Sequence, residues 1–397
     1  MRPRKWSIDA SHRACYTLYV PRHGKLPRAD GKEIVIAKKL VVRAILALLV
    51  ALCASCAVAV ALNHLNTDFS DLSDTDRQIL SELDAFCKAN ASDPVWEGFD
   101  LENKPILAIG GALKNAYLVN PTGEVGGLFA AKIEMPQDSA LRVYRVSFLA
   151  PQTLSTRFEV GNFNTLDKTY TVFGSDVYFI RYDRSTSIEA PNSSRHFITL
   201  LTHEAFHYYM QNQWSSGSRF EGELSERDVD LLAEEYDALA GIQAQLLTGA
   251  PDRDALIRYA RDYVDAMERR QAANPEYVQD ELSMETCEGT AQYVGICASR
   301  IVGYDYGVMY FDNARNVPLS DVVPVFRQGG IDESFLADKM PYQTGALLCR
   351  LLDALDAPDW QQRLNAQTPQ STTTLFALVR DYLDSIADAQ EGAQAAQ

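Results

Sequence analysis

The segment 200–209 constrains the fold of this chain more than any other, because it sets two histidines four residues apart within an apolar stretch. It reads Leu-Leu-Thr-His-Glu-Ala-Phe-His-Tyr-Tyr, where the histidines are His203 and His207 and the carboxylate is Glu204. Residues four apart on an α-helix lie about 40° apart around the axis and about 6 Å along it. A helix here therefore presents both imidazoles to one metal ion, and Glu204 to a water bound to that ion.

The distribution of histidines strengthens this interpretation. The chain has six, namely His12, His23, His64, His196, His203 and His207. Three of them precede the part that we expect to fold as a domain, so two of the remaining three belong to the motif. The alternative interpretation is a pair of ordinary surface or core histidines on a helix.

A second segment, 285–293, supplies a third ligand. A hydrolytic zinc site takes three protein ligands and leaves a fourth position to water, so two histidines need one more donor. The segment reads Glu-Thr-Cys-Glu-Gly-Thr-Ala-Gln-Tyr, and Glu285 and Glu288 share a helix face. We favour Glu288, because Gly289 and Ala291 would let this helix approach the histidine-bearing helix closely. Glu285 is then a solvated carboxylate or a hydrogen-bond acceptor for a ligand histidine.

The two motifs together resemble those of the gluzincin metallopeptidases, the group that includes thermolysin and the zinc aminopeptidases. The resemblance covers roughly residues 195–300 and consists of His-Glu-x-x-His followed by Glu-Gly-x-Ala-x-Tyr. It implies Zn²⁺ as the cofactor, Glu204 as the general base, and three metal ligands, His203, His207 and Glu288. The distance from His207 to Glu288 along the chain is long, and Gln292 stands where thermolysin has an Asp. Substrate preference is therefore not carried over.

A peptidase of this kind also needs a hydrogen-bond donor for the oxyanion of its tetrahedral intermediate. Three residues are candidates for this role: Tyr342, Tyr293 and His196. We favour Tyr342, because Met340-Pro341-Tyr342 follows a predicted loop and begins a predicted helix.

The amino-terminal part predicts a membrane anchor. Residues 41–62 are almost continuously apolar and long enough to cross a bilayer as a helix. Residues 1–43 contain eleven Lys or Arg and three Asp or Glu, a net charge of +8, so the remainder carries −24 to reach the total of −16. The positive-inside rule predicts a cytoplasmic tail at 1–40 and export of the acidic remainder. The acidic charge also excludes nucleic acid as a partner. In an alternative interpretation, Leu-Cys-Ala-Ser-Cys is a lipoprotein processing site, and Cys56 carries the lipid.

The exported part predicts an α+β fold, with strands first and helices after. We expect a juxtamembrane segment with a packing helix at 63–103 and a zincin-like metallopeptidase domain at 104–397. Strands of a largely antiparallel sheet are predicted at 106–109, 116–119, 141–149, 170–173 and 177–182. Helices are predicted at 73–89, 194–214, 227–247, 253–272, 276–302, 342–355 and 372–387. The strand at 177–182 is our candidate edge strand for an extended substrate.

Two further features complete the sequence reading. The charge runs at 234–237 and 268–270 predict solvated helix faces. Cys287 and Cys297 would lie about 15 Å apart on one helix, beyond disulfide reach, which predicts buried free thiols. The sequence thus favours a membrane-tethered, extracytoplasmic zinc peptidase that acts on peptide or protein substrates. The alternative is an exported zincin-fold binding or sensory module without peptidase activity.

Overall fold

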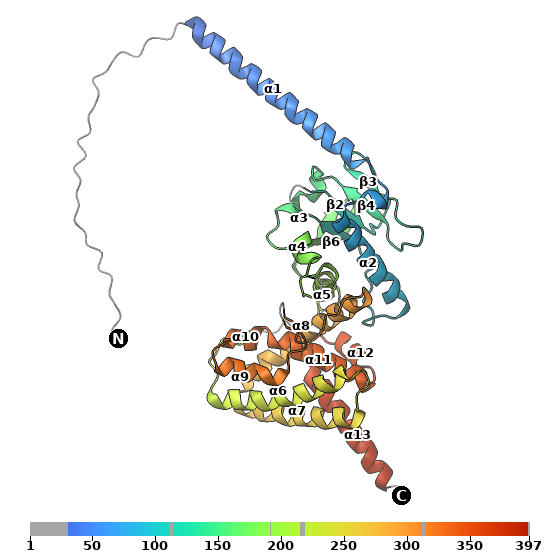
Figure 1. The fold of residues 1–397 in the computed structure, drawn as a ribbon, viewed down its shortest axis with the longest axis vertical. Coiled ribbons are helices and arrows are strands. Elements are labelled where there is room, and N and C mark those ends of the chain that lie inside the picture. Colours follow the sequence, from blue (N-terminus) through green and yellow to red (C-terminus); the bar gives the residue numbers. More distant parts are fainter. Residues whose placement is uncertain (1–30, 112–113, 191, 215–218, 312–313, 396–397) are drawn as a thin grey trace, which may run out of the picture. The chain divides into compact units, whose positions relative to one another are not determined.

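The computed structural model describes residues 31–111, 114–190, 192–214, 219–311 and 314–395. It divides into two compact units, Met1–Ala57 and Val58–Gln397. The predicted cytoplasmic tail at 1–40 lies largely outside the described residues. Within the second unit the fold is α+β, as predicted, with one sheet and a larger set of helices (Figure 1).

The first helix, α1, runs over Gly31–Asn63. Its part Lys38–Asn63 is long and apolar enough to cross a membrane. The apolar run at 41–62 is therefore helical as predicted. The helix does not end at the boundary between the two units, because its last residues, Val58 to Asn63, already belong to the second unit.

A buried arginine ties the end of α1 to the sheet. The guanidinium of Arg145 donates to the backbone carbonyls of Asn63, Leu65 and Asn66, and the Asn63 side chain donates in return to the carbonyl of Arg145. Both side chains are more than 90% buried. These bonds satisfy backbone carbonyls at and just after the end of α1.

Helix α2, Asp74–Ser92, belongs to the core of the second unit. The hydroxyl of Ser73 accepts from the backbone N–H of Asp76 and caps the helix. Its buried apolar side includes Ile79, Leu80, Leu83 and Phe86. The segment predicted as juxtamembrane, 63–103, is thus integrated into the domain core.

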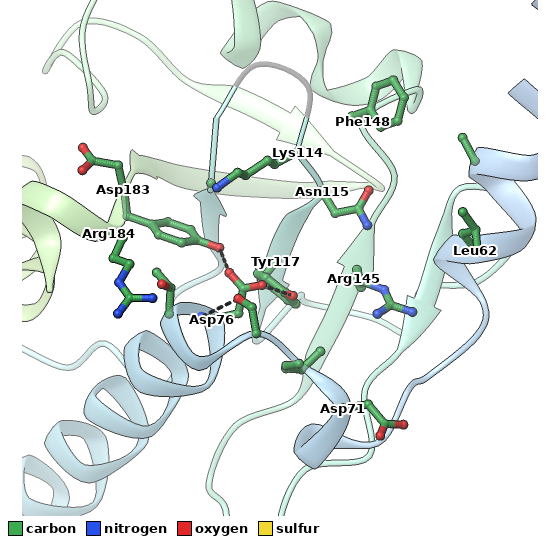
Figure 2. Close-up of a pocket in the computed structure, with 16 residues that line it drawn as sticks. Leu62, Asp71, Asp76, Lys114, Asn115, Tyr117, Arg145, Phe148, Asp183 and Arg184 are labelled. Carbon is green, nitrogen blue, oxygen red and sulfur yellow. Dashed lines mark hydrogen bonds between the residues drawn. The ribbon is translucent and has the colours of Figure 1, made fainter. Parts of the chain in front are cut away.

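A surface pocket of about 580 Å³ lies where the start of α2 meets the sheet. Figure 2 shows the carboxylate of Asp76 at its centre, where it accepts hydrogen bonds from the hydroxyls of Tyr117 and Tyr182 at 3.0 and 2.6 Å. Lys114 and Arg184 also line the pocket. None of the predicted metal ligands lines it, so this pocket is separate from the predicted site.

The sheet has six strands in the order β3-β4-β2-β1-β6-β5. Their bounds are β1 Ile106–Ile109, β2 Ala116–Val119, β3 Ala130–Lys132, β4 Val143–Val146, β5 Tyr170–Val172 and β6 Ser175–Arg181. All neighbouring strands pair antiparallel except β1 and β6, which are parallel, so the sheet is mixed rather than purely antiparallel. Strand β3 escaped prediction, because Ala-Ala-Lys has no β-branched or aromatic residue.

The prediction of an edge strand at 177–182 was wrong. Strand β6 pairs with β1 on one side and with β5 on the other, where Tyr170 lies opposite Val177. The backbone of Asn162 covers more of the same side by accepting from the N–H of Arg181. The two edges of the sheet are β3 and β5. The hydrophobic pattern of a sequence predicts which strands are buried, but it does not predict which strands pair. The hairpin of β5 with β6 could therefore not be predicted from it.

The helices after the sheet follow the predicted order, with ends that differ by up to a few residues. The long ones are α5 Phe197–Met210, α6 Glu226–Leu247, α7 Arg253–Ala273, α8 Pro275–Ile301, α11 Met340–Ala354 and α13 Leu375–Ala395. Short helices that were not predicted are α3 Leu154–Phe158, α4 Arg184–Ser187, α9 Val322–Arg327, α10 Glu333–Asp338 and α12 Trp360–Asn365. Three 3₁₀ turns lie at Phe69–Asp71, Pro151–Thr153 and Leu319–Asp321. Helix α5 lies between the sheet and the other long helices (Figure 1).

Helix α8 packs on α11 and α5, and glycines mark both contacts. A Cβ added at Gly289 or at Gly345 would overlap the backbone of the other helix, so α8 and α11 touch backbone to backbone there. The residue that faces α5 is Gly295, where a Cβ would lie 3.1 Å from the carbonyl oxygen of Thr199 and 3.6 Å from Cβ of His203. The expectation that Gly289 faces the histidine-bearing helix is corrected: it faces α11.

The charge runs of α6 and α7 are only partly solvated. Arg270 is buried between Glu235 and Glu281 and forms ion pairs with both. Burial raises the pKa of both carboxyls, while the coulombic effect of Arg270 opposes that rise. The prediction of solvated faces was therefore wrong for Glu235 and Arg270, because residues adjacent in sequence on a helix point to different sides.

Candidate metal centre

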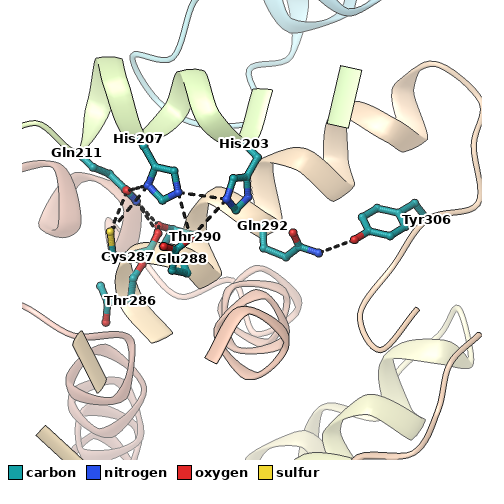
Figure 3. A network of polar contacts seen from close by, with 9 residues as sticks. All are labelled: His203, His207, Gln211, Thr286, Cys287, Glu288, Thr290, Gln292 and Tyr306. Atoms are coloured by element: carbon teal, nitrogen blue, oxygen red, sulfur yellow. Dashed lines mark hydrogen bonds and ion pairs between the residues drawn. The ribbon is translucent and has the colours of Figure 1, made fainter. Parts of the chain in front are cut away.

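Helix α5 carries the predicted histidine pair and is held in a fixed orientation about its axis. Its apolar side includes Phe206, whose ring packs edge-on against Trp96 with the ring centroids 4.9 Å apart. Trp96 is fully buried. With this side held against the core, His203 and His207 point together toward α8, one helical turn apart (Figure 3).

Three ligand atoms converge between α5 and α8. Nε2 of His207 lies 3.1 Å from Oε2 of Glu288, and Nε2 of His203 lies 3.4 Å from the same oxygen. The two Nε2 atoms are 3.1 Å apart. All three atoms lie within 4.8 Å of one another. Two imidazole nitrogens and one carboxylate oxygen that meet at one point form a donor set that fits a divalent cation such as zinc.

The ligand side chains shift one another's pKa values. Burial by itself raises the pKa of Glu288, but hydrogen bonds from His203 and His207 outweigh it and hold this pKa well below its usual range. Burial favours the neutral form of His207, yet its partners, Cys287 and Glu288, raise its pKa. An ionised carboxylate is the form of Glu288 that a cation site requires.

Glu204 lies beside the ligands without joining them. It follows His203 directly in α5 and is partly exposed. Burial raises its pKa, a rise that Glu288 reinforces and that His203 and His207 oppose. A carboxyl whose pKa is raised toward neutrality is better suited to accept a proton and to return it.

The structure brings one of the three candidate oxyanion donors to the cluster. The ring of Tyr342, at the start of α11, is parallel to that of His203, with centroids 5.8 Å apart and an interplanar angle of 6°. The hydroxyl of Tyr293 instead donates to Asp353 at 2.6 Å. His196 is fully buried, and its Nε2 lies 3.6 Å from a carboxylate oxygen of Glu82.

Glu285, the competing carboxylate, lies apart from the cluster. It is 1% exposed and accepts from the hydroxyl of Tyr263 at 3.4 Å. Burial raises its pKa well above the usual range, and the nearby Glu235 and Glu281 add to that rise. The sequence suggested that Glu285 is a solvated carboxylate or a partner of a ligand histidine. In the structure it is neither. It faces the buried ion pairs of Arg270 with Glu235 and Glu281 instead.

Sequence reasoning missed Gln211, which directly follows α5. Its Oε1 lies 2.5 Å from Nδ1 of His207, and Figure 3 shows it between that histidine and α8. The available signal was its position one helical turn after a ligand histidine. Cys287, half-buried beside it, donates from Sγ to the same oxygen at 3.2 Å. Both Cys287 and Cys297 are free thiols, as predicted, but both are partly rather than fully buried.

No protein-family model, curated protein or solved structure matches this chain.

Proposed function

We propose that this protein is a membrane-tethered zinc metallopeptidase of the gluzincin type, with a zincin-like domain outside the cytoplasm. The observation that carries the proposal is the convergence of His203, His207 and Glu288 from two helices, with Glu204 next to them but outside the ligand set. A binding module needs ligands for its metal, but it has no need of an additional carboxylate beside them.

The proposed chemistry is hydrolysis without a covalent enzyme intermediate. Zinc held by His203, His207 and Glu288 would supply a water of lowered pKa and would polarise the scissile carbonyl. Glu204 accepts the proton of the attacking water and returns it to the leaving amine, a role that its burial supports by raising its pKa. Ionised Glu288 stays a ligand because its own pKa is held low.

Tyr342 is the proposed donor to the oxyanion. Its ring packs parallel to that of His203, and its hydroxyl lies near enough to Glu288 to bond with it. Burial and the neighbouring carboxylates raise its pKa, so the phenol stays protonated at neutral pH and is able to donate. One donor to an oxyanion is typically worth a few kcal/mol of transition-state stabilisation.

The ligand assignment is tested by two carboxylate variants of α8. Full-length protein in detergent is expected to retain about one zinc per chain through its three ligands. Glu288→Ala should lose that zinc on dialysis, because two histidines alone hold it weakly. Glu285→Ala, and Glu285→Gln as the variant that keeps the side-chain shape, should retain it. Metal analysis after dialysis gives the answer, and zinc loss in the Glu285 variants with retention in Glu288→Ala would refute the assignment.

The topology is tested by protease protection in intact cells. The net charge of +8 in residues 1–43 and the helix Lys38–Asn63 support an inside tail and an outside domain. Protease added outside should digest the domain and spare the first forty residues, as followed by tags at the two ends of the chain. Lysed cells serve as the control, in which both ends are digested. A domain that stays intact until lysis contradicts the proposed orientation.

A further inference from the structure

We propose that Gln211 is a positioning residue that holds His207 in the tautomer whose Nε2 binds the metal. This inference rests on the proposed zinc site. Gln211 is 4% exposed, and its backbone N–H donates to the carbonyl of His207 at 3.2 Å. Its backbone and its side chain therefore both contact the residue that it orients.

The side-chain amide of Gln211 has one orientation that satisfies its neighbours. Its Nε2 lies 2.8 Å from the carbonyl oxygen of Cys287 and 2.7 Å from Oγ1 of Thr290. A carbonyl oxygen only accepts, so the nitrogen must face it. The Thr290 hydroxyl donates to the carbonyl of Thr286 at 2.7 Å, so its oxygen accepts from Gln211. The amide oxygen of Gln211 must therefore be the atom that faces Nδ1 of His207.

This orientation determines where His207 carries its proton. Oε1 of Gln211 has no hydrogen, so Nδ1 of His207, 2.5 Å away, must be the donor. As a metal ligand His207 must be neutral, and an imidazole that keeps its proton on Nδ1 then has its lone pair on Nε2. That nitrogen is the one that lies 3.1 Å from Oε2 of Glu288 and 3.1 Å from Nε2 of His203. Gln211 thus selects the nitrogen that belongs to the ligand cluster.

The same side chain also joins the two helices that carry the ligands. Cys287 and Thr290, which accept from its nitrogen, lie on either side of Glu288 along α8. The Cys287 thiol does not substitute for Gln211, because its sulfur is 3.9 Å from Nδ1 of His207 and donates to Gln211 instead. A partner of this kind for a metal-binding histidine typically changes metal affinity by about 10- to 100-fold.

The test compares three variants of the full-length protein in detergent, with zinc affinity measured by competition against a chelator. Gln211→Met keeps the length of the side chain and removes its acceptor, so it should bind zinc about 10- to 100-fold more weakly. Gln211→Glu restores an acceptor for Nδ1 and should recover most of that affinity, although a buried carboxylate facing the Cys287 carbonyl costs stability. A purely structural role predicts the reverse order, with the Glu variant the weaker binder.

Gln243→Met is the matched control. Gln243 is 5% exposed and bonds the carbonyl of Val317 at 3.0 Å and the N–H of Leu319 at 3.1 Å, in α6 and away from the ligands. It should lose stability as Gln211→Met does and still bind zinc like the unmodified protein. Equal affinity in all variants overturns the role of Gln211 and leaves the zinc site standing. An unmodified chain that binds no zinc refutes the proposed function and this inference together.

Discussion

Glu204→Gln is expected to leave zinc content and fold unchanged while peptide hydrolysis falls by about two orders of magnitude or more. The reason is positional, because Glu204 is next to a ligand in sequence yet lies outside the three-atom ligand set. The substitution keeps the shape of the side chain and removes its ability to accept a proton. Turnover of a mixed peptide library by the wild type and the variant, each with its zinc content determined, measures the effect.

Glu268→Gln is the control for this substitution, since Glu268 is exposed on α7 and the chemical change is the same. It should hydrolyse the library like the wild type. Equal turnover by wild type and Glu204→Gln would reject Glu204 as the general base. A zinc-loaded wild type that cleaves nothing in the library would instead favour an exported binding or sensory module.

Gly345→Ala is expected to destabilise the domain by about 3 kcal/mol or more, because a Cβ has no space between α8 and α11. It would overlap the carbonyl oxygen of Glu285 and the Cα of Gly289, both of which are backbone atoms of a buried helix. Backbone cannot rotate away as a side chain can, so the helices must separate. Glu288 would move with α8 and Tyr342 with α11, so zinc affinity should also fall.

Thermal unfolding followed by tryptophan fluorescence measures this effect, with an expected fall in Tm of about 5 °C or more. Gly123→Ala is the matched control, because a Cβ there meets nothing within 4 Å. Its Tm should stay close to that of the wild type. A Gly345→Ala protein that unfolds at the wild-type temperature would show that the two helices do not meet at this point.

Local sequence was sufficient for most elements of the fold. The strands at Ile106–Ile109 and Ala116–Val119 were predicted with their observed bounds, because short apolar runs between turn residues report strand burial directly. The short helices α9 and α10 were missed, because six residues hold too little periodicity to distinguish a helix from a loop.

The sequence by itself determined that His203 and His207 form a pair, because residues four apart on a helix lie on the same side of it. It also determined the long apolar helix α1, whose signal is composition over many residues. Only the tertiary structure decided which carboxylate completes the group of metal ligands. Glu288 and Glu285 lie one helical turn apart on α8. The packing of this helix turns Glu288 toward the two histidines and Glu285 toward the buried carboxylates Glu235 and Glu281. The tertiary structure alone placed Gln211, Tyr342 and the backbone contact at Gly345, because contacts between helices depend on how each helix is rotated in the core, which no local pattern encodes.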